Sequence, residues 1–233
     1  MNARSPKGVI FPFVTVTLIW SSTWIVIRDQ LGVVPAGWSV AYRFAIAAIG
    51  MAVLARCMGI SLRIGRRGLI FSALLGLAQF ALNFNLVYRA EAHLTSGLVA
   101  LVYALMVIPN SVLSWALFKD RISPAFLLGS IIALSGVGLL FLNEYRMSAT
   151  ATPQEVLLGV GITSLGMLCA SSANVMQASP FARTLPTIAM LSWAMGFGAL
   201  ADAVFAWATV GPPVIEPRLG YWLGTFYLAL AGS

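Results

Sequence analysis

Charged side chains are scarce in this chain of 233 residues. Only 9% of the residues are Asp, Glu, Lys or Arg, whereas a soluble domain carries roughly 25%. Hydrophobic residues make up 60% of the chain. This imbalance excludes an ordinary soluble domain and predicts a protein whose main partner is the lipid bilayer. The net charge of +7 does not predict nucleic-acid binding, because the basic residues lie between apolar segments and form no patch.

Residues that bind metals or perform covalent chemistry are also rare. The two cysteines, Cys57 and Cys169, and the single histidine, His93, suggest neither a disulfide framework nor a metal centre. The chain has no glycine-rich phosphate loop and no arrangement of nucleophile and base. Most of its few carboxylates fall between apolar segments, where they make a poor acid–base pair. We therefore expect no catalytic residue, no metal and no cofactor, and we predict that the protein is not an enzyme.

Long apolar runs dominate the chain, and each can cross a bilayer, which takes about 20 residues. They cover residues 8–27, 30–57, 68–88, 94–118, 122–143, 156–182 and 184–201, and a further run begins at Gly220. The second run is interrupted only by Arg43 and Arg56. Backbone groups in lipid must form hydrogen bonds within their own segment, so each run is predicted to be a helix. The sequence thus predicts seven complete transmembrane helices and part of an eighth.

The charges between these runs predict the orientation of the chain. Basic residues favour the cytoplasmic ends of transmembrane helices. With the N-terminus in the cytoplasm, the inner segments hold nine Lys and Arg residues and the outer segments hold four, while Arg43 lies within a span. Acidic residues show the opposite bias, since only Asp120 falls on the inner side. We therefore predict a cytoplasmic N-terminus.

A short motif of the first predicted helix recurs 150 residues later. Residues 18–24, Leu-Ile-Trp-Ser-Ser-Thr-Trp, align with residues 168–174, Leu-Cys-Ala-Ser-Ser-Ala-Asn. At a shift of 151, Pro35 falls on Pro186. An odd number of predicted spans separates the two copies, so one copy is inverted. Inverted repeats are typical of secondary transporters, whose substrate sites lie near the bilayer midplane where the repeats meet.

The repeat divides the chain into unequal parts. We predict a first repeat of five helices at residues 1–145, an external linker at 146–156 and an incomplete second repeat at 157–233. Ser233 aligns with Leu82, so a complete second repeat requires on the order of 60 further residues by repeat arithmetic. We expect the chain to be a fragment or a truncated product. The predicted fold class is an all-α integral membrane protein, an inverted-repeat bundle with seven helices and a partial eighth of an expected ten.

Several short motifs occur in an order that is typical of one transporter family. Tryptophan and small residues at 18–24 are followed by Tyr-Arg-Phe-Ala-Ile-Ala-Ala at 42–48, by Ile108-Pro109, by Lys-Asp-Arg-Ile-Ser at 119–123 and by Gly-Val-Gly-Leu-Leu at 136–140. Together they resemble the drug/metabolite transporter superfamily, specifically its EamA-type ten-helix members. Asp120 stands where a glutamate is more usual. The resemblance implies a carrier of small metabolites, often amino acids, in an inner or plasma membrane and frequently in the export direction.

The first predicted helix offers aromatic and hydroxyl groups for a substrate site. Trp20 and Trp24 are four residues apart and share a helical face, so their indole rings can stack on a flat apolar solute and offer N–H donors. Ser21 adds a hydroxyl, and polar groups are costly against lipid. The alternative interpretation is an aromatic belt at the membrane surface and small residues for helix packing. We predict that Trp20, Ser21 and Trp24 contribute to substrate binding.

The third and fourth predicted helices carry amides. Gln79 and Asn83 are four apart, and an amide both donates and accepts hydrogen bonds, which suits a polar or zwitterionic solute. Tyr103 and Asn110 are the candidates of the fourth helix, where Pro109 can kink the chain and free a carbonyl. The alternatives are hydrogen bonds between helices and a kink without ligand contact. We predict substrate contacts from these four polar residues.

Arg43 is the sharpest anomaly, because a buried arginine in lipid is expensive. It can hold a substrate carboxylate with its planar fork, or it can anchor helix ends or extend toward the surface. A pair with Asp202, at a similar predicted depth, is a further alternative. In the sixth predicted helix, Ser171 and Asn174 complete the predicted substrate site, in which Asn174 aligns with Trp24.

These features predict a secondary transporter of small metabolites, such as amino acids or aromatic compounds, that works by alternating access and exports them. The alternative functions are a non-transporting membrane assembly partner or sensor, and a channel. The small residues Ala125, Gly129 and Ala133 share one face of a helix, so a homodimer is a possible assembly.

Overall fold

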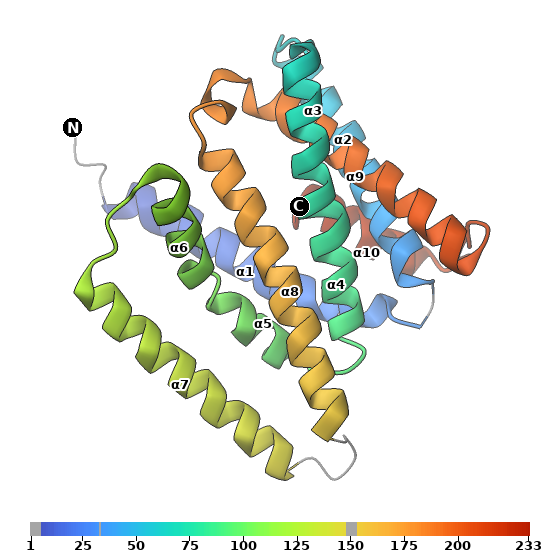
Figure 1. Ribbon diagram of the computed structural model, residues 1–233. Helices are drawn as coiled ribbons and strands as arrows, with labels where there is room; N and C mark the ends of the chain where they lie inside the picture. Colours follow the sequence, from blue (N-terminus) through green and yellow to red (C-terminus); the bar gives the residue numbers. More distant parts are fainter. Residues whose placement is uncertain (1–5, 33, 148–152) are drawn as a thin grey trace.

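The computed structural model describes residues 6–32, 34–147 and 153–233 (Figure 1). It is 82% helical, and these residues contain no strand. The helical elements are α1 (Pro6–Gln30), α2 (Ala36–Cys57), α3 (Gly65–Gly76), the π-helix η1 (Leu77–Leu82), α4 (Asn83–Ala90), α5 (Ser96–Ala104), α6 (Val107–Phe118), α7 (Pro124–Met147), α8 (Pro153–Ala178), the 3-10 turn η2 (Ala182–Thr184), α9 (Thr187–Val210) and α10 (Leu219–Leu230).

Seven helical segments in the described ranges are long and apolar enough to cross a membrane. They are Ile10–Gln30, Ala36–Cys57, Gly65–Ala90, Ser96–Phe118, Pro124–Leu142, Gln154–Ala178 and Thr187–Val210. The helix α10 is apolar but shorter. The prediction of an all-α membrane protein with seven full spans and a shorter eighth helix is confirmed. The boundary between the predicted repeats stays a prediction. The helix α7 runs to Met147, α8 starts at Pro153, and residues 148–152 of the predicted linker lie outside the described residues.

The core forms where α9 packs lengthwise against α2 and, on another side, against α3 and η1. A second contact joins α4 to α8 (Figure 1). Glycine residues permit the close approach of α9 to α3 and η1. A Cβ atom added to Gly76 of α3 would lie 2.1 Å from the backbone oxygen of Ala194 in α9, and one on Gly198 would lie 2.6 Å from the Cβ of Phe80. Close backbone contact of this kind replaces the hydrophobic driving force, which is absent between helices in lipid.

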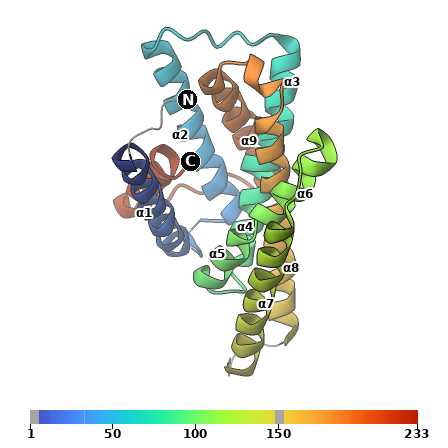
Figure 2. The same cartoon turned by 90° about the vertical axis from the view of Figure 1, so that its left-hand side faces the viewer.

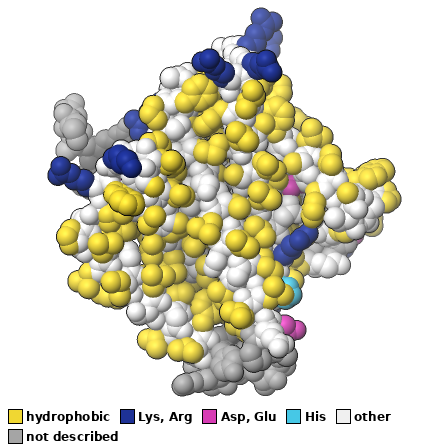
Figure 3. Space-filling view, viewed as in Figure 1, with side chains coloured by type: hydrophobic (Ala, Val, Ile, Leu, Met, Phe, Trp, Pro, Cys, Tyr) yellow, Lys and Arg dark blue, Asp and Glu magenta, His cyan; other side chains and the backbone are white. Residues whose placement is uncertain are grey.

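The outer surface is mostly hydrophobic, as a lipid-facing surface should be. Yellow apolar side chains cover most of the face in Figure 3, while Lys and Arg side chains gather at the end where α3 begins. The helix α7 lies at the edge of the bundle in Figure 1 and faces the viewer in Figure 2. Its side chains Leu128, Ile131 and Ile132 are strongly exposed. Its small-residue face at Ala125, Gly129 and Ala133 is also exposed, and dimerisation through it stays a prediction.

Two transmembrane segments are not continuous α-helices. Gly65–Ala90 contains the π-helix η1 between α3 and α4, and such segments occur frequently at functional sites. Ser96–Phe118 is broken at Leu105 and Met106, between α5 and α6. Leu105 lies four residues before Pro109, and a proline ring clashes with the carbonyl of the fourth preceding residue. Both irregular segments contribute residues to the cavity described below.

The connection between α4 and α5 holds a partly sequestered carboxyl group. Glu91 is 8% exposed, its Oε2 accepts a hydrogen bond from the Ser96 hydroxyl at 3.2 Å, and its Oε1 has no partner within the described residues. Burial raises the pKa of Glu91 from 4.5 to about 7, although the Ser96 hydrogen bond and the charge of Arg28 act in the opposite direction. The folded protein therefore binds this proton more tightly than the unfolded chain does.

This carboxyl predicts a pH-dependent stability. Because the folded-state pKa is raised, the contribution of Glu91 is fully present below about pH 4.5 and is lost as the pH rises toward 7. We expect Glu91→Gln to reduce the fall in thermal unfolding temperature between pH 5 and pH 8 in detergent. Asp29→Asn, which changes an exposed carboxylate at the end of α1, serves as the control. An equal fall in the wild type and in Glu91→Gln would contradict this assignment.

Candidate functional site

A cavity of about 180 Å³ lies among α1, η1, α4 and α5. Its lining consists of Trp20, Thr23, Trp24, Ile27, Arg43, Gln79, Phe80, Asn83, Phe84, Val87, Tyr103, Met106, Ala170, Gly232 and Ser233. Its volume is below the roughly 300 Å³ at which sites for drug-sized ligands begin, so it suits a solute of small-metabolite size. Six of the ten predicted site residues line it, namely Trp20, Trp24, Arg43, Gln79, Asn83 and Tyr103.

Arg43 provides the positive charge of the cavity. The side chain extends from α2 and is 1% exposed. Its Nη2 donates to the carbonyl of Gly232 at 2.8 Å, and its Nε donates to the hydroxyl of Ser233 at 3.0 Å. The guanidinium carbon lies 4.4 Å from the ring centroid of Phe84, a cation–π contact. The Tyr88 hydroxyl approaches the guanidinium, but the buried Nη1 makes no hydrogen bond of acceptable geometry within the described residues, so this nitrogen can still donate to an anionic ligand.

Two amides and a hydroxyl form a hydrogen-bonded chain in the cavity, and this chain offers an acceptor where Arg43 offers a donor. The Tyr103 hydroxyl donates to Oδ1 of Asn83 at 2.6 Å, and Nδ2 of Asn83 donates to the backbone carbonyl of Gln79 at 3.2 Å. The Oε1 of Gln79 is buried and accepts no hydrogen bond from the described residues. Gln79 and Asn83 therefore lie on one face, as their spacing predicted. The Oε1 of Gln79 remains available to accept a hydrogen bond from a donor group of a ligand.

Aromatic rings form the wall next to α1. Trp24 meets Tyr103 edge to face, with ring centroids 6.0 Å apart and planes at 61°, an arrangement that aromatic pairs prefer. Trp20 is 60% exposed, and both Trp20 and Trp24 line the cavity and also a groove between α1 and the start of α5. The two tryptophans therefore separate the cavity from this groove, and Trp24 is the more buried of the pair.

Four predicted site residues lie elsewhere. Ser21 is exposed, borders the groove between α1 and α5 and donates its hydroxyl to its own helix at Thr17. Asn110 is half-buried in α6, and Ser171 is fully buried in α8 with no hydrogen-bond partner for its hydroxyl among the described residues. Asn174 contacts the sulfur of Met106 at 3.6 Å. Since Met106 lines the cavity, Asn174 lies behind its wall.

The structure also adds residues that were not predicted. Phe80 and Phe84 flank Phe44 with ring centroids 4.8 Å apart in each case. Phe80 and Phe84 are four residues apart, so the sequence places them on one face. Aromatic side chains are common at lipid-facing positions, so this spacing cannot tell a cavity-lining face from a lipid-facing one. Gly232 and Ser233 carried no recognisable signal, because they contribute mainly through hydrogen bonds to Arg43.

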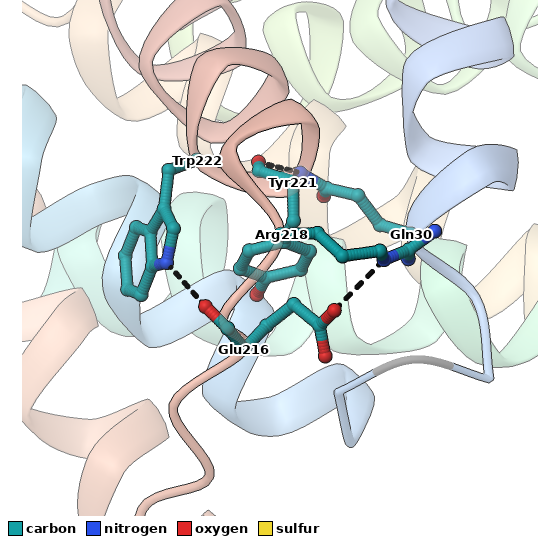
Figure 4. Close-up of polar contacts among 5 residues, drawn as sticks. All are labelled: Gln30, Glu216, Arg218, Tyr221 and Trp222. Carbon is teal, nitrogen blue, oxygen red and sulfur yellow. Dashed lines mark hydrogen bonds and ion pairs between the residues drawn. The ribbon is translucent and has the colours of Figure 1, made fainter.

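A buried polar network lies next to the cavity, beyond Ile27 and Val87. Gln30 of α1 donates to the hydroxyl of Thr225 at 2.9 Å and accepts from the Tyr88 hydroxyl at 3.2 Å. Gln30 also approaches the carbonyl of Tyr221 at 3.4 Å (Figure 4). These contacts join α1, α4 and α10, so they set the position of α1 and its tryptophans relative to the other helices.

The start of α10 is held by a second set of contacts. Arg218 forms an ion pair with Glu216 at 2.8 Å, and the indole N–H of Trp222 donates to the Glu216 carbonyl at 2.8 Å (Figure 4). The Tyr221 hydroxyl lies 2.8 Å from that of Ser39 in α2. This end of the bundle is therefore cross-linked by polar groups.

The chain resembles known proteins both in sequence and in fold. The sequence model of the EamA-like transporter family matches residues 7–142. Protein PagO of Salmonella typhimurium (strain LT2) is 24% identical over 153 residues, which are 66% of this chain and 48% of PagO. The chain therefore spans about half the length of this curated relative. A solved crystal structure superimposes with a TM-score of 0.62 at 20% identity, over 93% of this chain and 74% of the other, which is a likeness of fold.

Proposed function

The chain belongs to the EamA-like transporter family, and from this we propose that it is a secondary carrier that exports small amino-acid-like or aromatic metabolites. The observation that carries the proposal is the pair of unsatisfied buried groups in one cavity. Arg43 offers a cationic donor at Nη1, and Gln79 offers an acceptor at Oε1. Unpaired buried polar groups are costly, and a ligand with both a carboxylate and an amine satisfies both.

The aromatic wall supports a preference for flat side chains. Trp24 and Tyr103 line the cavity and meet edge to face, and ring pairs contribute about 0.5–1.5 kcal/mol beyond their buried area. The small volume supports metabolites rather than large drugs. We propose that the carboxylate binds near Arg43, that the amine binds near Gln79 and that the side chain packs toward Trp24.

We propose that transport follows alternating access, with the segments 1–145 and 157–233 moving against each other. The cavity lining supports this, because it combines residues of both segments: α1, α2, η1, α4 and α5 from the first, and Ala170 and Gly232 from the second. The biased loop charges support a cytoplasmic N-terminus, and we propose an inner or plasma membrane location from the family to which the chain belongs.

Counterflow in proteoliposomes tests the proposal. Vesicles loaded with unlabelled solute are given labelled tryptophan, phenylalanine or alanine outside, and protein-free vesicles serve as the control. We expect protein-dependent exchange, faster for the aromatic amino acids than for alanine. Absence of exchange for the whole panel would contradict the carrier proposal. Binding without exchange would favour the alternative of a membrane sensor or assembly partner.

A further inference from the structure

A second buried polar site lies outside the cavity, on α9. Asp202 is 1% exposed, its Oδ1 accepts a hydrogen bond from Nδ2 of Asn85 in α4 at 2.5 Å, and its Oδ2 has no partner within the described residues. Asp202 lies eight residues before the end of α9 at Val210, which is about 12 Å along the helix axis. An acidic side chain within a transmembrane helix is rare and is usually functional.

Small residues and tryptophan cover this carboxyl on the side of the nearer helix end. Ala206 follows Asp202 by one turn, and a Cβ atom added to Gly37 of α2 would lie 3.0 Å from the Cβ of Ala206. Further along, the indole N–H of Trp38 donates to the carbonyl of Gly211 at 3.1 Å. The contact between α2 and α9 therefore separates Asp202 from the end of the bundle, and moving these helices apart would open a path to it.

Among the described residues, no Lys or Arg side chain forms an ion pair with Asp202. From α2, Arg43 donates to Gly232 and Ser233, and the Tyr42 hydroxyl donates to the carbonyl of Val214. The pair of Arg43 with Asp202, one of the alternatives for Arg43, does not form within the described residues, where Asp202 accepts a hydrogen bond from Asn85.

Among the residues that the structure describes, the other elements around α9 add no cationic partner for Asp202. From α4, the guanidinium of exposed Arg89 lies 5.3 Å from the ring centroid of Phe205, and the Tyr88 hydroxyl donates to Gln30. From α10, Tyr221 contacts Ser39. The π-helix η1 has no charged residue, and Arg66 and Arg67 lie at the far end of α3.

We propose that Asp202 is a proton-binding site of this protein and that a proton gradient drives transport through it. An ionised carboxylate that is buried without a cationic partner is strongly disfavoured relative to its neutral acid. In the closed arrangement Asp202 therefore holds a proton on Oδ2. When α2 and α9 separate, water reaches the group, the O–H bond of Asp202 breaks and the proton passes to water as hydronium, which leaves a hydrated carboxylate. Rebinding from the other side of the membrane reverses these changes.

This coupling rests on the proposed carrier function, but the proton site can be tested without any substrate. Infrared spectroscopy of the purified full chain detects the C=O stretch of a protonated carboxyl group. We expect such a band to persist from pH 5 to pH 8 in the wild type, to be absent in Asp202→Asn and to be retained in Asp29→Asn. The band of Glu91 is distinguished because Glu91→Gln removes it and because it fades between pH 5 and pH 8.

A second variant assigns the band without removing the carboxyl group. Asn85→Ala deletes the donor to Oδ1, so the C=O stretch of Asp202 should shift to higher frequency, as expected for a carbonyl that loses a hydrogen bond. Absence of a persistent band in the wild type would overturn the proposal. A band that neither Asp202→Asn removes nor Asn85→Ala shifts would overturn it as well.

Proteoliposomes test the coupling with labelled tryptophan and alanine. A gradient of about one pH unit supports up to about tenfold accumulation under one-for-one exchange. We expect the wild type to accumulate label and Asp202→Asn to show none, although Asp202→Asn still exchanges label in counterflow, which needs no net proton movement. Accumulation by Asp202→Asn equal to that of the wild type would overturn the coupling. If neither solute exchanges in the wild type, the carrier proposal fails, while the infrared result still decides the proton site.

Discussion

Arg43→Met is expected to lower the affinity for amino acids in counterflow on the order of a hundredfold. The methionine removes the buried Nη1 donor of the cavity and leaves the substrate carboxylate without its cationic partner. Removing one partner of a buried charged pair costs about 2–5 kcal/mol, and each 1.4 kcal/mol is a factor of ten in affinity. Labelled tryptophan exchange at graded concentrations measures the loss.

The design separates a substrate role of Arg43 from a structural one. Arg43 also holds Gly232 through a 2.8 Å hydrogen bond, so the variant is expected to lower the thermal unfolding temperature as well. Tryptamine lacks the carboxylate, so unlabelled tryptamine should inhibit the exchange of labelled solute equally well in the wild type and in Arg43→Met. Unlabelled tryptophan should inhibit this exchange strongly only in the wild type. Arg43→Lys should recover part of the affinity, because lysine keeps the charge but not the planar fork.

Arg56→Met provides the matched control, since Arg56 lies in the last turn of the same helix and is exposed. It should leave tryptophan affinity within about twofold, as expected for an exposed residue without a cavity contact. An equal loss of tryptophan and tryptamine competition in Arg43→Met would assign Arg43 to structure alone. That outcome would contradict the carboxylate subsite.

Gly76→Ala is expected to destabilise the protein by about 1–3 kcal/mol, the usual cost of overpacking. The new Cβ would lie 2.1 Å from the carbonyl oxygen of Ala194 and 3.1 Å from the backbone nitrogen of Gly198. Both neighbours are backbone atoms of α9, which cannot rotate away, so α3 and α9 must separate. The thermal unfolding temperature in detergent measures the effect.

Gly196→Ala is the matched control for this packing prediction. It lies on α9, and its added Cβ would meet only the Cβ of Ala48, at 3.9 Å, which is ordinary van der Waals contact. Alanine is favoured over glycine inside a helix by about 0.5–1 kcal/mol, so this variant should be as stable as the wild type or slightly more stable. Similar unfolding temperatures for Gly76→Ala and Gly196→Ala would contradict the proposed close contact.

The helical segments were predictable because lipid imposes one strong rule. Each transmembrane backbone must satisfy its own hydrogen bonds, so apolar length alone predicted the seven long spans. Relations within one helix were also predictable. Gln79 and Asn83 share a face because they are four residues apart, and the cavity contains both. Interruptions were harder: Pro109 predicted a kink, whereas nothing in residues 77–82 predicted the π-helix η1.

Contacts between residues of different helices could not be predicted from spacing along the sequence. The spacing of residues 20–24 did not predict that Trp24 would face Tyr103 while Ser21 would face outward. The depth of Asp202 suggested Arg43 as a partner, but Asn85 of α4 occupies that place. Asn110, Ser171 and Asn174 are polar in the same way as Asn83, yet they lie outside the cavity lining.

The amino-acid sequence by itself determined the membrane environment, the number of long helices and the transporter family, because these depend on composition, length and the order of motifs. The tertiary structure alone decided which polar side chains share a cavity and which buried carboxyl has no charged partner in the described part of the chain. The physical reason is rotation about the helix axis. A transmembrane helix that is apolar on all sides has no strong amphipathic direction, so only close contacts such as Gly76 with Ala194 determine which face turns inward.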